Sequence, residues 1–258
     1  MSADTEPAVL SERRGRVLII TLNRPEQRNA VNAAVAQGVA AALDELDGDR
    51  DLSVGILTGA GKGFCSGMDL KAFRDGERPQ VEGRGFAGIV ERAADKPLIA
   101  AIEGFAVAGG LEVALACDLI VASRGARLGI PEVKRSLLAA GGALFRLPRT
   151  IPRNVAMELA LTGDLIEAER AYDLGLVNRL TEPRQALDAA FQLAETIAAN
   201  GPLALAATKR VMVESADWPD SEFFARQRGL IDPVFASEDA REGAAAFAER
   251  RDPVWKGR

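Results

Sequence analysis

The segment PLIAAIEGFAVAGGLEVALACDLIVA, residues 97–122, decides the fold of this 258-residue chain. Residues 97–102 form a short apolar run, which predicts a buried strand, and residues 118–122 predict another. Between the two runs a glycine pair leads into a short helix that contains Glu112. Two strands joined through a helix predict a βαβ unit, and therefore a mostly parallel sheet.

The same alternation of apolar runs and helical patterns occurs throughout the first half of the chain. Residues 16–22 and 53–58 predict two more strands, and residues 32–46 predict an amphipathic helix between them. We therefore expect an α/β fold with helices between consecutive strands. A polar stretch with three glycines, residues 79–88, predicts a mobile segment that can cover a site.

The second half becomes helical from residue 151 onward. The predicted helices span residues 152–161, 167–174, 186–199, 203–214, 221–230 and 237–250. A turn sequence at residues 200–202 interrupts this pattern, so we expect a core over residues 1–200 and a helical portion over residues 201–258. A portion of roughly 60 residues buries little core alone, so it should pack on the core or on another subunit.

Composition restricts the chemistry. The chain contains no histidine, which excludes Ser-His-Asp and Cys-His catalysis and leaves carboxylates, Lys, Tyr or Cys for acid–base work. The two cysteines, Cys65 and Cys117, give neither a disulfide framework nor a zinc spacing, so no metal site is expected. The net charge of −5 argues against nucleic acid as a partner. Without a signal peptide or a membrane-spanning run, we expect a cytoplasmic protein.

Two glycine-containing turns and two glutamates form the predicted active site. In the first turn, FCSGMDL at residues 64–70, the glycine permits close backbone approach and leaves the Met68 N–H free to donate. The second turn, AVAGGLE at residues 106–112, starts a helix whose first N–H groups lack intrahelical partners. This turn ends in Glu112, and the second glutamate, Glu132, follows a proline after another predicted strand.

Each feature alone has an ordinary structural explanation: a plain loop, a flexible helix start, or a solvated glutamate. Together they lie at strand ends and helix starts, where α/β folds build their sites. Two N–H donors suit a thioester carbonyl that gains negative charge, and each donor can stabilise the transition state by roughly 3 kcal/mol. Two carboxyl groups can divide the roles of general acid and general base.

These motifs, in this order, resemble the crotonase superfamily of enoyl-CoA hydratases and isomerases along nearly the whole chain. The resemblance begins with LNRPEQRNAVN, residues 22–32, passes through both turns and Glu132, and ends with SEDAREGAAAF, residues 237–247. It implies a crotonase-like spiral of ββα units with a helical C-terminal trimerisation portion. It also implies an acyl-CoA thioester substrate from fatty-acid β-oxidation, no separate cofactor, and a homotrimer or a dimer of trimers.

The resemblance also assigns roles to residues. Met68 and Gly109 match the N–H donors of an oxyanion hole, and Glu112 and Glu132 match the two catalytic glutamates of hydratases. Because both acids are present, we expect reversible hydration of 2-trans-enoyl-CoA to 3-hydroxyacyl-CoA. Glu132 is then the proton donor to C2, and Glu112 the base that deprotonates the water attacking C3.

The same resemblance places coenzyme A near the first turn. The expected CoA-binding residues there are Arg28, Ser66, Asp69 and Lys71. Arg250, at the end of the last predicted helix, is expected to reach the CoA of a neighbouring subunit. Cys65 and Ser66 have no histidine to activate them, so we expect packing or hydrogen bonding rather than nucleophilic attack.

Two features depart from short-chain hydratases. Met68 stands where many of them have a small residue, and residues 134–142 are closer to carnitinyl-CoA dehydratase-like members. Acyl length and branching therefore stay open. The alternatives are another crotonase reaction, either double-bond isomerisation or carnitinyl-CoA-type dehydration, and a non-catalytic or RNA-binding relative.

Overall fold

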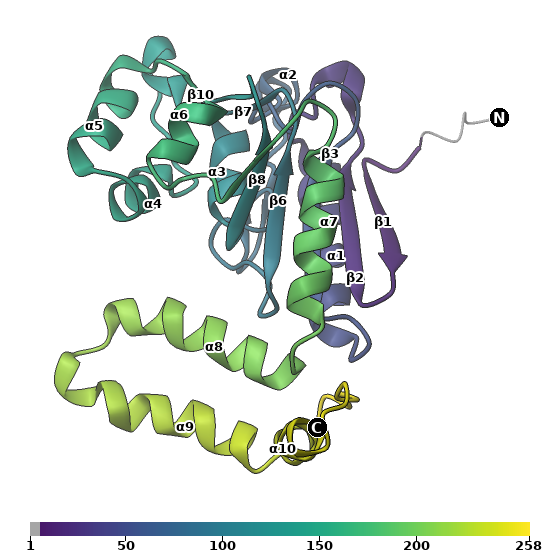
Figure 1. Ribbon diagram of the computed structural model, residues 1–258. Helices are drawn as coiled ribbons and strands as arrows, with labels where there is room; N and C mark the ends of the chain where they lie inside the picture. Colours follow the sequence, from purple (N-terminus) through teal and green to yellow (C-terminus); the bar gives the residue numbers. More distant parts are fainter. Residues whose placement is uncertain (1–5) are drawn as a thin grey trace.

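The structure is a computed structural model that describes residues 6–258, and its centre is a six-stranded sheet (Figure 1). The strand order is β1-β2-β3-β6-β8-β11; the β1–β2 pair is antiparallel and the other pairs are parallel. The strands are β1 (Val9–Arg14), β2 (Val17–Leu22), β3 (Val54–Gly59), β6 (Leu98–Ile102), β8 (Leu119–Ser123) and β11 (Arg179–Thr181). The prediction of an α/β fold with a mostly parallel sheet is confirmed.

Both faces of this sheet are covered, as is usual for parallel strands. Alternate residues of β2 divide between the faces. Leu18 belongs to the apolar cluster that contains α1 (Ala33–Gly48), while Val17 belongs to the cluster that contains α7 (Ala186–Ala198). Burial on both sides explains why β2 is a continuous apolar run with no polar alternation.

A smaller sheet beside the first carries part of the site. Its order is β10-β9-β7, with β7 (Phe105–Val107), β9 (Arg127–Gly129) and β10 (Ile166–Glu167). The chain passes from β6 into β7 after two residues, and from β7 into α3 (Gly109–Leu115) after one. The second sheet therefore holds the start of α3 close to the end of the central strand β6.

The remaining short elements surround this region. They are η1 (Pro25–Gln27), α2 (Leu70–Arg74), β4 (Gln80–Val81), β5 (Gly85–Phe86), η2 (Pro131–Arg135), α4 (Ala143–Thr150), α5 (Arg153–Thr162) and α6 (Ala168–Asp173). Helices α4 and α5 pack on each other in a lobe at one side of the core (Figure 1). Within residues 6–258, no helix has the length and apolar character that a membrane crossing needs.

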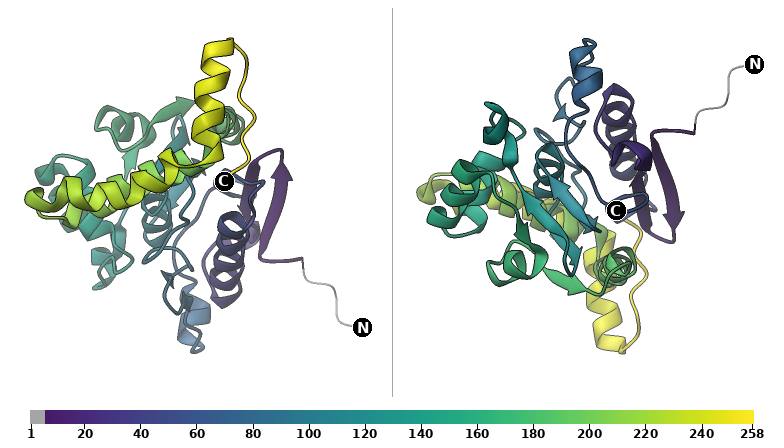
Figure 2. Two further views of the ribbon diagram at one scale, coloured as in Figure 1. Left: turned by 90° about the horizontal axis from the view of Figure 1, so that it is seen from below. Right: turned by 90° about the horizontal axis from the view of Figure 1, so that it is seen from above.

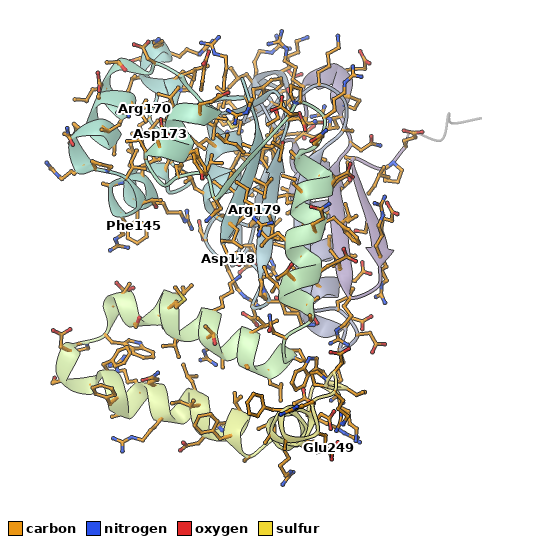
Figure 3. All side chains as sticks on the ribbon, in the orientation of Figure 1. Asp118, Phe145, Arg170, Asp173, Arg179 and Glu249 are labelled. Atoms are coloured by element: carbon orange, nitrogen blue, oxygen red, sulfur yellow. The ribbon has the colours of Figure 1, made fainter. Side chains whose placement is uncertain are left out.

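The C-terminal portion forms an arm outside the core. Its elements are α8 (Pro202–Glu214), η3 (Ser215–Asp217), η4 (Asp220–Glu222), α9 (Phe223–Phe235) and α10 (Glu238–Glu249). Helices α8 and α9 pack together beneath the core, and α10 runs at a steep angle from the end of α9 (Figures 1 and 2). The arm is tied to the sheet because the Lys209 ammonium contacts the Asp118 carboxylate at 2.7 Å. Asp118 lies at the end of the sheet that faces α8 (Figure 3).

Among the places where the structure differs from the sequence-based expectations, three have a clear physical reason. Strand β1 is missed by the apolar-run criterion, because its sequence is mostly polar and exposed as an edge strand. Helix α4 is missed because Pro148 is atypical of a helix interior. Residues 79–88, expected as a mobile segment, form the β4–β5 hairpin. The buried Arg84 side chain anchors this hairpin by donating to the Arg92 carbonyl oxygen at 3.2 Å.

Candidate active site

The first turn places the Met68 N–H on the open side of a short backbone pairing. Val31 and Met68 form an isolated parallel bridge. In this bridge the Val31 N–H donates to the Gly67 carbonyl at 2.8 Å, and the Asp69 N–H donates to the Val31 carbonyl at 2.9 Å. Because the groups that flank Met68 face Val31, the Met68 N–H points to the other side. Among residues 6–258 it has no backbone acceptor.

The second turn presents the Gly109 N–H. Ala108 has φ 55° and ψ −131°, a strained conformation for a residue with a side chain, which turns the backbone sharply between β7 and α3. Gly109 is the first residue of α3, so its N–H has no intrahelical partner, and the described residues offer it no backbone acceptor. The two turns adjoin, since a Cβ atom built on Gly67 would lie 3.0 Å from the Gly109 nitrogen.

Glu112 is held in α3 by two backbone N–H groups from a distant loop. Its side chain is buried, and Oε1 accepts from the Gly141 N–H at 2.7 Å and from the Ala143 N–H at 3.1 Å. Burial raises the pKa of Glu112, while these two hydrogen bonds and the nearby Arg146 guanidinium oppose the increase. One carboxylate oxygen is therefore fixed, and Oε2 is left for chemistry.

Glu132 sits in the first turn of η2 in a different environment. Its Oε2 atom is buried, and the described residues provide no hydrogen-bond partner for it. Burial raises the pKa of Glu132, and the charge on Glu112 raises it further. Two carboxyl groups whose surroundings differ in this way can take different acid–base roles.

The two glutamates and both donors line one cleft of about 910 Å³. Arg28 and Ser66 also line it, together with three further basic residues, Arg127, Lys134 and Arg135. A second, mostly apolar cavity of about 500 Å³ lies between η2, α4 and α5, and it shares Glu132 and Leu138 with the cleft. The structure therefore brings together a polar reaction site, a basic wall and an apolar annex.

Three of the residues expected to bind CoA do not line this cleft. Asp69 caps α2 by accepting from the Lys71 and Ala72 N–H groups, and its carboxylate contacts the Arg24 guanidinium at 3.0 Å. Lys71 is exposed in the first turn of α2. Arg250 is the left-handed C-cap of α10, in the arm. Their contact with CoA stays a prediction.

The thiols are unsuited to nucleophilic attack. Cys65 is buried, which raises its pKa to about 12, and its sulfur accepts a hydrogen bond from the Gly67 N–H at 3.4 Å. Burial also raises the pKa of Cys117. A thiol that remains protonated at neutral pH is a poor nucleophile, so packing is the role that the structure supports for Cys65.

Sequence reasoning missed two residues that shape the site. Phe86 of β5 packs against the second turn, since a Cβ built on Gly109 would lie 2.6 Å from a Phe86 ring carbon. Gly141 holds Glu112, and a Cβ at position 141 would lie 2.6 Å from Glu112 Oε2. The glycine pair at residues 141–142 was a visible signal, but nothing in the sequence links it to a glutamate 29 residues earlier.

Comparison with known proteins shows the family. The model of the enoyl-CoA hydratase/isomerase family matches residues 12–258. An enoyl-CoA hydratase of Mycobacterium tuberculosis is 42% identical over 266 residues, which cover 100% of this chain and 99% of that protein. The carnitinyl-CoA dehydratase of Salmonella enteritidis is 40% identical over 254 residues, which cover 95% and 97% of the two chains.

Solved structures give the same result. The crystal structure of an enoyl-CoA hydratase from Mycobacterium tuberculosis has a TM-score of 0.96 and 62% identity, covering 98% of this chain and 100% of that one. The carnitinyl-CoA hydratase of Mycobacterium avium has a TM-score of 0.79 and 45% identity, with 98% and 100% coverage. The chain therefore has the crotonase fold and belongs to the enoyl-CoA hydratase/isomerase family of enzymes.

Proposed function

We propose that this protein catalyses the reversible addition of water to 2-trans-enoyl-CoA, giving 3-hydroxyacyl-CoA. The observation that carries the proposal is that one cleft holds the buried Glu112, Glu132 with its buried Oε2 atom, and two N–H donors that have no backbone acceptor in residues 6–258. An isomerase needs one acid–base group that moves a proton between two carbons. Hydration must deliver a proton to one carbon and remove one from water, which two carboxyl groups can do.

The different surroundings of the glutamates suggest their roles. Glu112, with Oε1 fixed by two N–H groups, suits a carboxylate base whose Oε2 takes a proton from the water that attacks C3. Glu132, whose Oε2 has no hydrogen-bond partner among the described residues, suits a protonated acid that donates to C2. The Met68 and Gly109 N–H groups would stabilise the thioester oxygen as it becomes an enolate. All groups are supplied by the protein, so the reaction needs no metal and no redox cofactor.

The basic wall of the cleft supports a CoA thioester as the substrate class. Arg28, Arg127 and Arg135 supply positive charge on a chain whose net charge is −5. The fourth basic residue, Lys134, pairs with the Asp164 carboxylate at 2.6 Å. Such a local concentration of cations suits the phosphates of CoA. Free thiols and a CoA substrate fit the cytoplasm, where we place the protein.

A panel of enoyl-CoA thioesters in ¹⁸O-labelled water tests the proposal. The expected product is 3-hydroxyacyl-CoA that carries the label at C3. A product with a moved double bond and no label would make the protein an isomerase, and the absence of turnover with every thioester would leave a binding function. A carnitinyl thioester belongs in the panel, because a relative that is 40% identical is named a carnitinyl-CoA dehydratase.

A further inference from the structure

Arg146 is a half-buried cation that the proposed reaction does not use directly. It lies in the first turn of α4, and its side chain folds back over the helix start. One nitrogen, Nη1, donates to the Gly141 carbonyl at 3.2 Å, and Nη2 donates to the Val90 carbonyl at 2.6 Å. Partial burial of a guanidinium charge is costly and lowers the pKa of Arg146, so its two hydrogen bonds to carbonyls of separate segments call for a functional explanation.

The first contact acts on the loop that holds Glu112. The Gly141 and Ala143 N–H groups both donate to Glu112 Oε1, and the Gly141 carbonyl held by Arg146 lies between them along the backbone. A change in the direction of that carbonyl rotates the peptide planes on either side. Gly142, the next residue of this loop, lies directly against the Arg146 guanidinium, since a Cβ built on it would overlap Arg146 Nη1.

The second contact acts on the segment that carries Phe86. The Ile89 and Val90 N–H groups both donate to the Phe86 carbonyl at 3.3 Å, so residues 86–90 form a tight turn. Phe86 lies against Gly109, which presents one of the two oxyanion donors. By holding the Val90 carbonyl, Arg146 fixes the end of this turn relative to α4.

We propose that Arg146 is a positioning residue for the hydration step, which joins the loop that holds Glu112 to the turn that holds Phe86 over Gly109. The proposal rests on the proposed function, because it assigns Arg146 an effect on the base of that reaction. Arg146 touches no reacting atom. It sets the orientation of the base and the relation of the base to the oxyanion donors.

Charge gives the proposal a second readout. The charged groups coupled to Glu112 are Arg146 from α4, which lowers the pKa of Glu112, and Glu132 from η2, whose own pKa Glu112 raises. Cys117, two residues after α3, is half-buried, and its raised pKa keeps the thiol neutral. The Arg146 charge and the two N–H groups oppose the effect of burial on the pKa of Glu112. When the Arg146 charge is removed, only the two N–H groups oppose it, and the pKa of Glu112 rises.

The test compares Arg146→Met and Arg146→Lys with the control Arg149→Met. Arg149 lies on the same helix, exposed, with its guanidinium 3.6 Å from the Phe145 ring centre, and Phe145 projects outward from the lobe (Figure 3). We expect Arg146→Met to lower kcat by about 10- to 100-fold, as a small misplacement of a catalytic group does, with little change in KM. The acid limb of the pH–rate profile should move to higher pH.

Arg146→Lys separates charge from geometry. A lysine keeps the positive charge but has no planar fork to hold two carbonyls. We expect it to keep the acid limb in place and still lose kcat by about 10-fold. Equal kcat and equal acid limbs in both Arg146 variants and in Arg149→Met would overturn the proposal. So would a lower unfolding temperature with unchanged kcat, because it would mean that Arg146 is only structural.

Carboxyl ¹³C NMR of labelled glutamate provides a measurement that does not depend on catalytic turnover. The Glu112 signal, assigned by its loss in Glu112→Gln, should titrate at higher pH in Arg146→Met than in the parent protein. An unchanged titration overturns the proposal. If the parent protein hydrates no enoyl thioester, the proposed function fails on the ¹⁸O panel, while this titration still decides whether Arg146 acts on Glu112.

Discussion

At the scale of single residues, the site depends on two carboxyl groups with the same chemistry and different partners. Glu112 has one oxygen fixed by two N–H groups, whereas Glu132 has one buried oxygen without a partner in residues 6–258. The pKa of both is raised by burial. The unequal hydrogen bonding, rather than the burial, is therefore the difference on which the proposed assignment of base and acid rests.

Conservative substitution of each acid tests this division. Glu112→Gln and Glu132→Gln keep the shape of the side chain and remove its ability to exchange a proton. We expect each to lower kcat by at least about 100-fold, the contribution of a positioned acid or base, with KM for the thioester nearly unchanged. Steady-state kinetics check this. A loss of only a few-fold would remove that glutamate from the mechanism, and full activity in Glu132→Gln would indicate a one-acid isomerase.

The proposed oxyanion donors are backbone groups, so their test must change the backbone. Gly109→Pro removes one N–H and should abolish measurable turnover, since the loss of one donor costs about 100- to 1,000-fold and proline also strains the turn. Met68→Ala keeps the N–H and should change acyl preference more than the rate on a short substrate. If Met68→Ala were as inactive as Gly109→Pro, the backbone role of Met68 would be wrong.

Because one carboxyl oxygen of Glu132 is buried, we expect Glu132 to lower the stability of the folded protein by an amount that depends on pH. Because the folded pKa is raised above 4.5, the unfolded chain loses this proton at lower pH than the folded protein does. Destabilisation thus appears as pH rises through 4.5 toward the folded pKa, and persists above it. Glu132→Gln should therefore raise the unfolding temperature by a few degrees at neutral pH. Below pH 4.5 the gain should vanish.

Thermal unfolding monitored by circular dichroism measures this difference. Glu158→Gln is the matched control, because Glu158 is exposed on α5 and should show no gain at either pH. At neutral pH, Glu132→Gln could also unfold at the same temperature as the parent protein or at a lower one. That result would contradict the prediction and would mean that the Glu132 charge is well solvated in the folded protein.

At the scale of elements, the sequence predicts what is local. The runs at residues 97–102 and 118–122 became β6 and β8 because buried parallel strands need continuous apolar sequence. The glycine turn before α3 was also visible, since residues 108–110 carry their own conformational signal. Contacts between segments far apart in sequence were not visible. Two such contacts arise from the packing of α4: the hydrogen bond between Gly141 and Glu112, and the one between Arg146 and Val90. The helix itself was not predicted, because it contains Pro148.

The cavity between α4 and α5 leads to a prediction about the acyl chain. It adjoins Glu132 and is lined mainly by aliphatic side chains, so it suits the tail of a longer acyl group. Ala160→Phe places a ring in this cavity. We expect kcat/KM to fall by about 10-fold or more for long-chain enoyl-CoA, and to change little for crotonyl-CoA.

The control for this prediction is Glu158→Phe, which adds the same ring to the same helix at an exposed position that does not line the cavity. It should leave the chain-length profile unchanged. Equal losses on short and long substrates in Ala160→Phe would place the acyl tail elsewhere.

At the scale of the whole molecule, the chain exposes too much surface for a compact monomer. Its accessible surface is 13977 Å², whereas a monomer of 27.3 kDa typically exposes roughly 10,900 Å². The arm carries large apolar side chains that are more than half exposed: Met212, Val213, Phe224, Phe235 and Phe247. An arm with this much apolar surface indicates a partner surface.

We propose that the partner is a second copy of this chain in a closed trimer or a dimer of trimers. The sequence expectation of trimerisation and the exposed arm support this proposal. Phe247→Asp should then shift the mass measured by light scattering from an oligomer to a monomer, because Phe247 is 87% exposed in the isolated chain. Tyr172→Asp, on α6 at the opposite end of the molecule from the arm, is the control and should leave the mass unchanged (Figure 1).

Assembly also gives Arg250 its proposed role. In its own chain Arg250 lies at the end of α10, outside the cleft, so it can meet CoA only if the arm reaches the cleft of a neighbour. Arg250→Ala should then raise KM for a CoA thioester by about threefold to tenfold, the weight of a phosphate contact, and leave kcat unchanged. Light scattering and steady-state kinetics on the same preparation test the assembly and the role of Arg250 together. A parent protein that is monomeric and fully active would contradict both the closed assembly and the contribution of Arg250 across it.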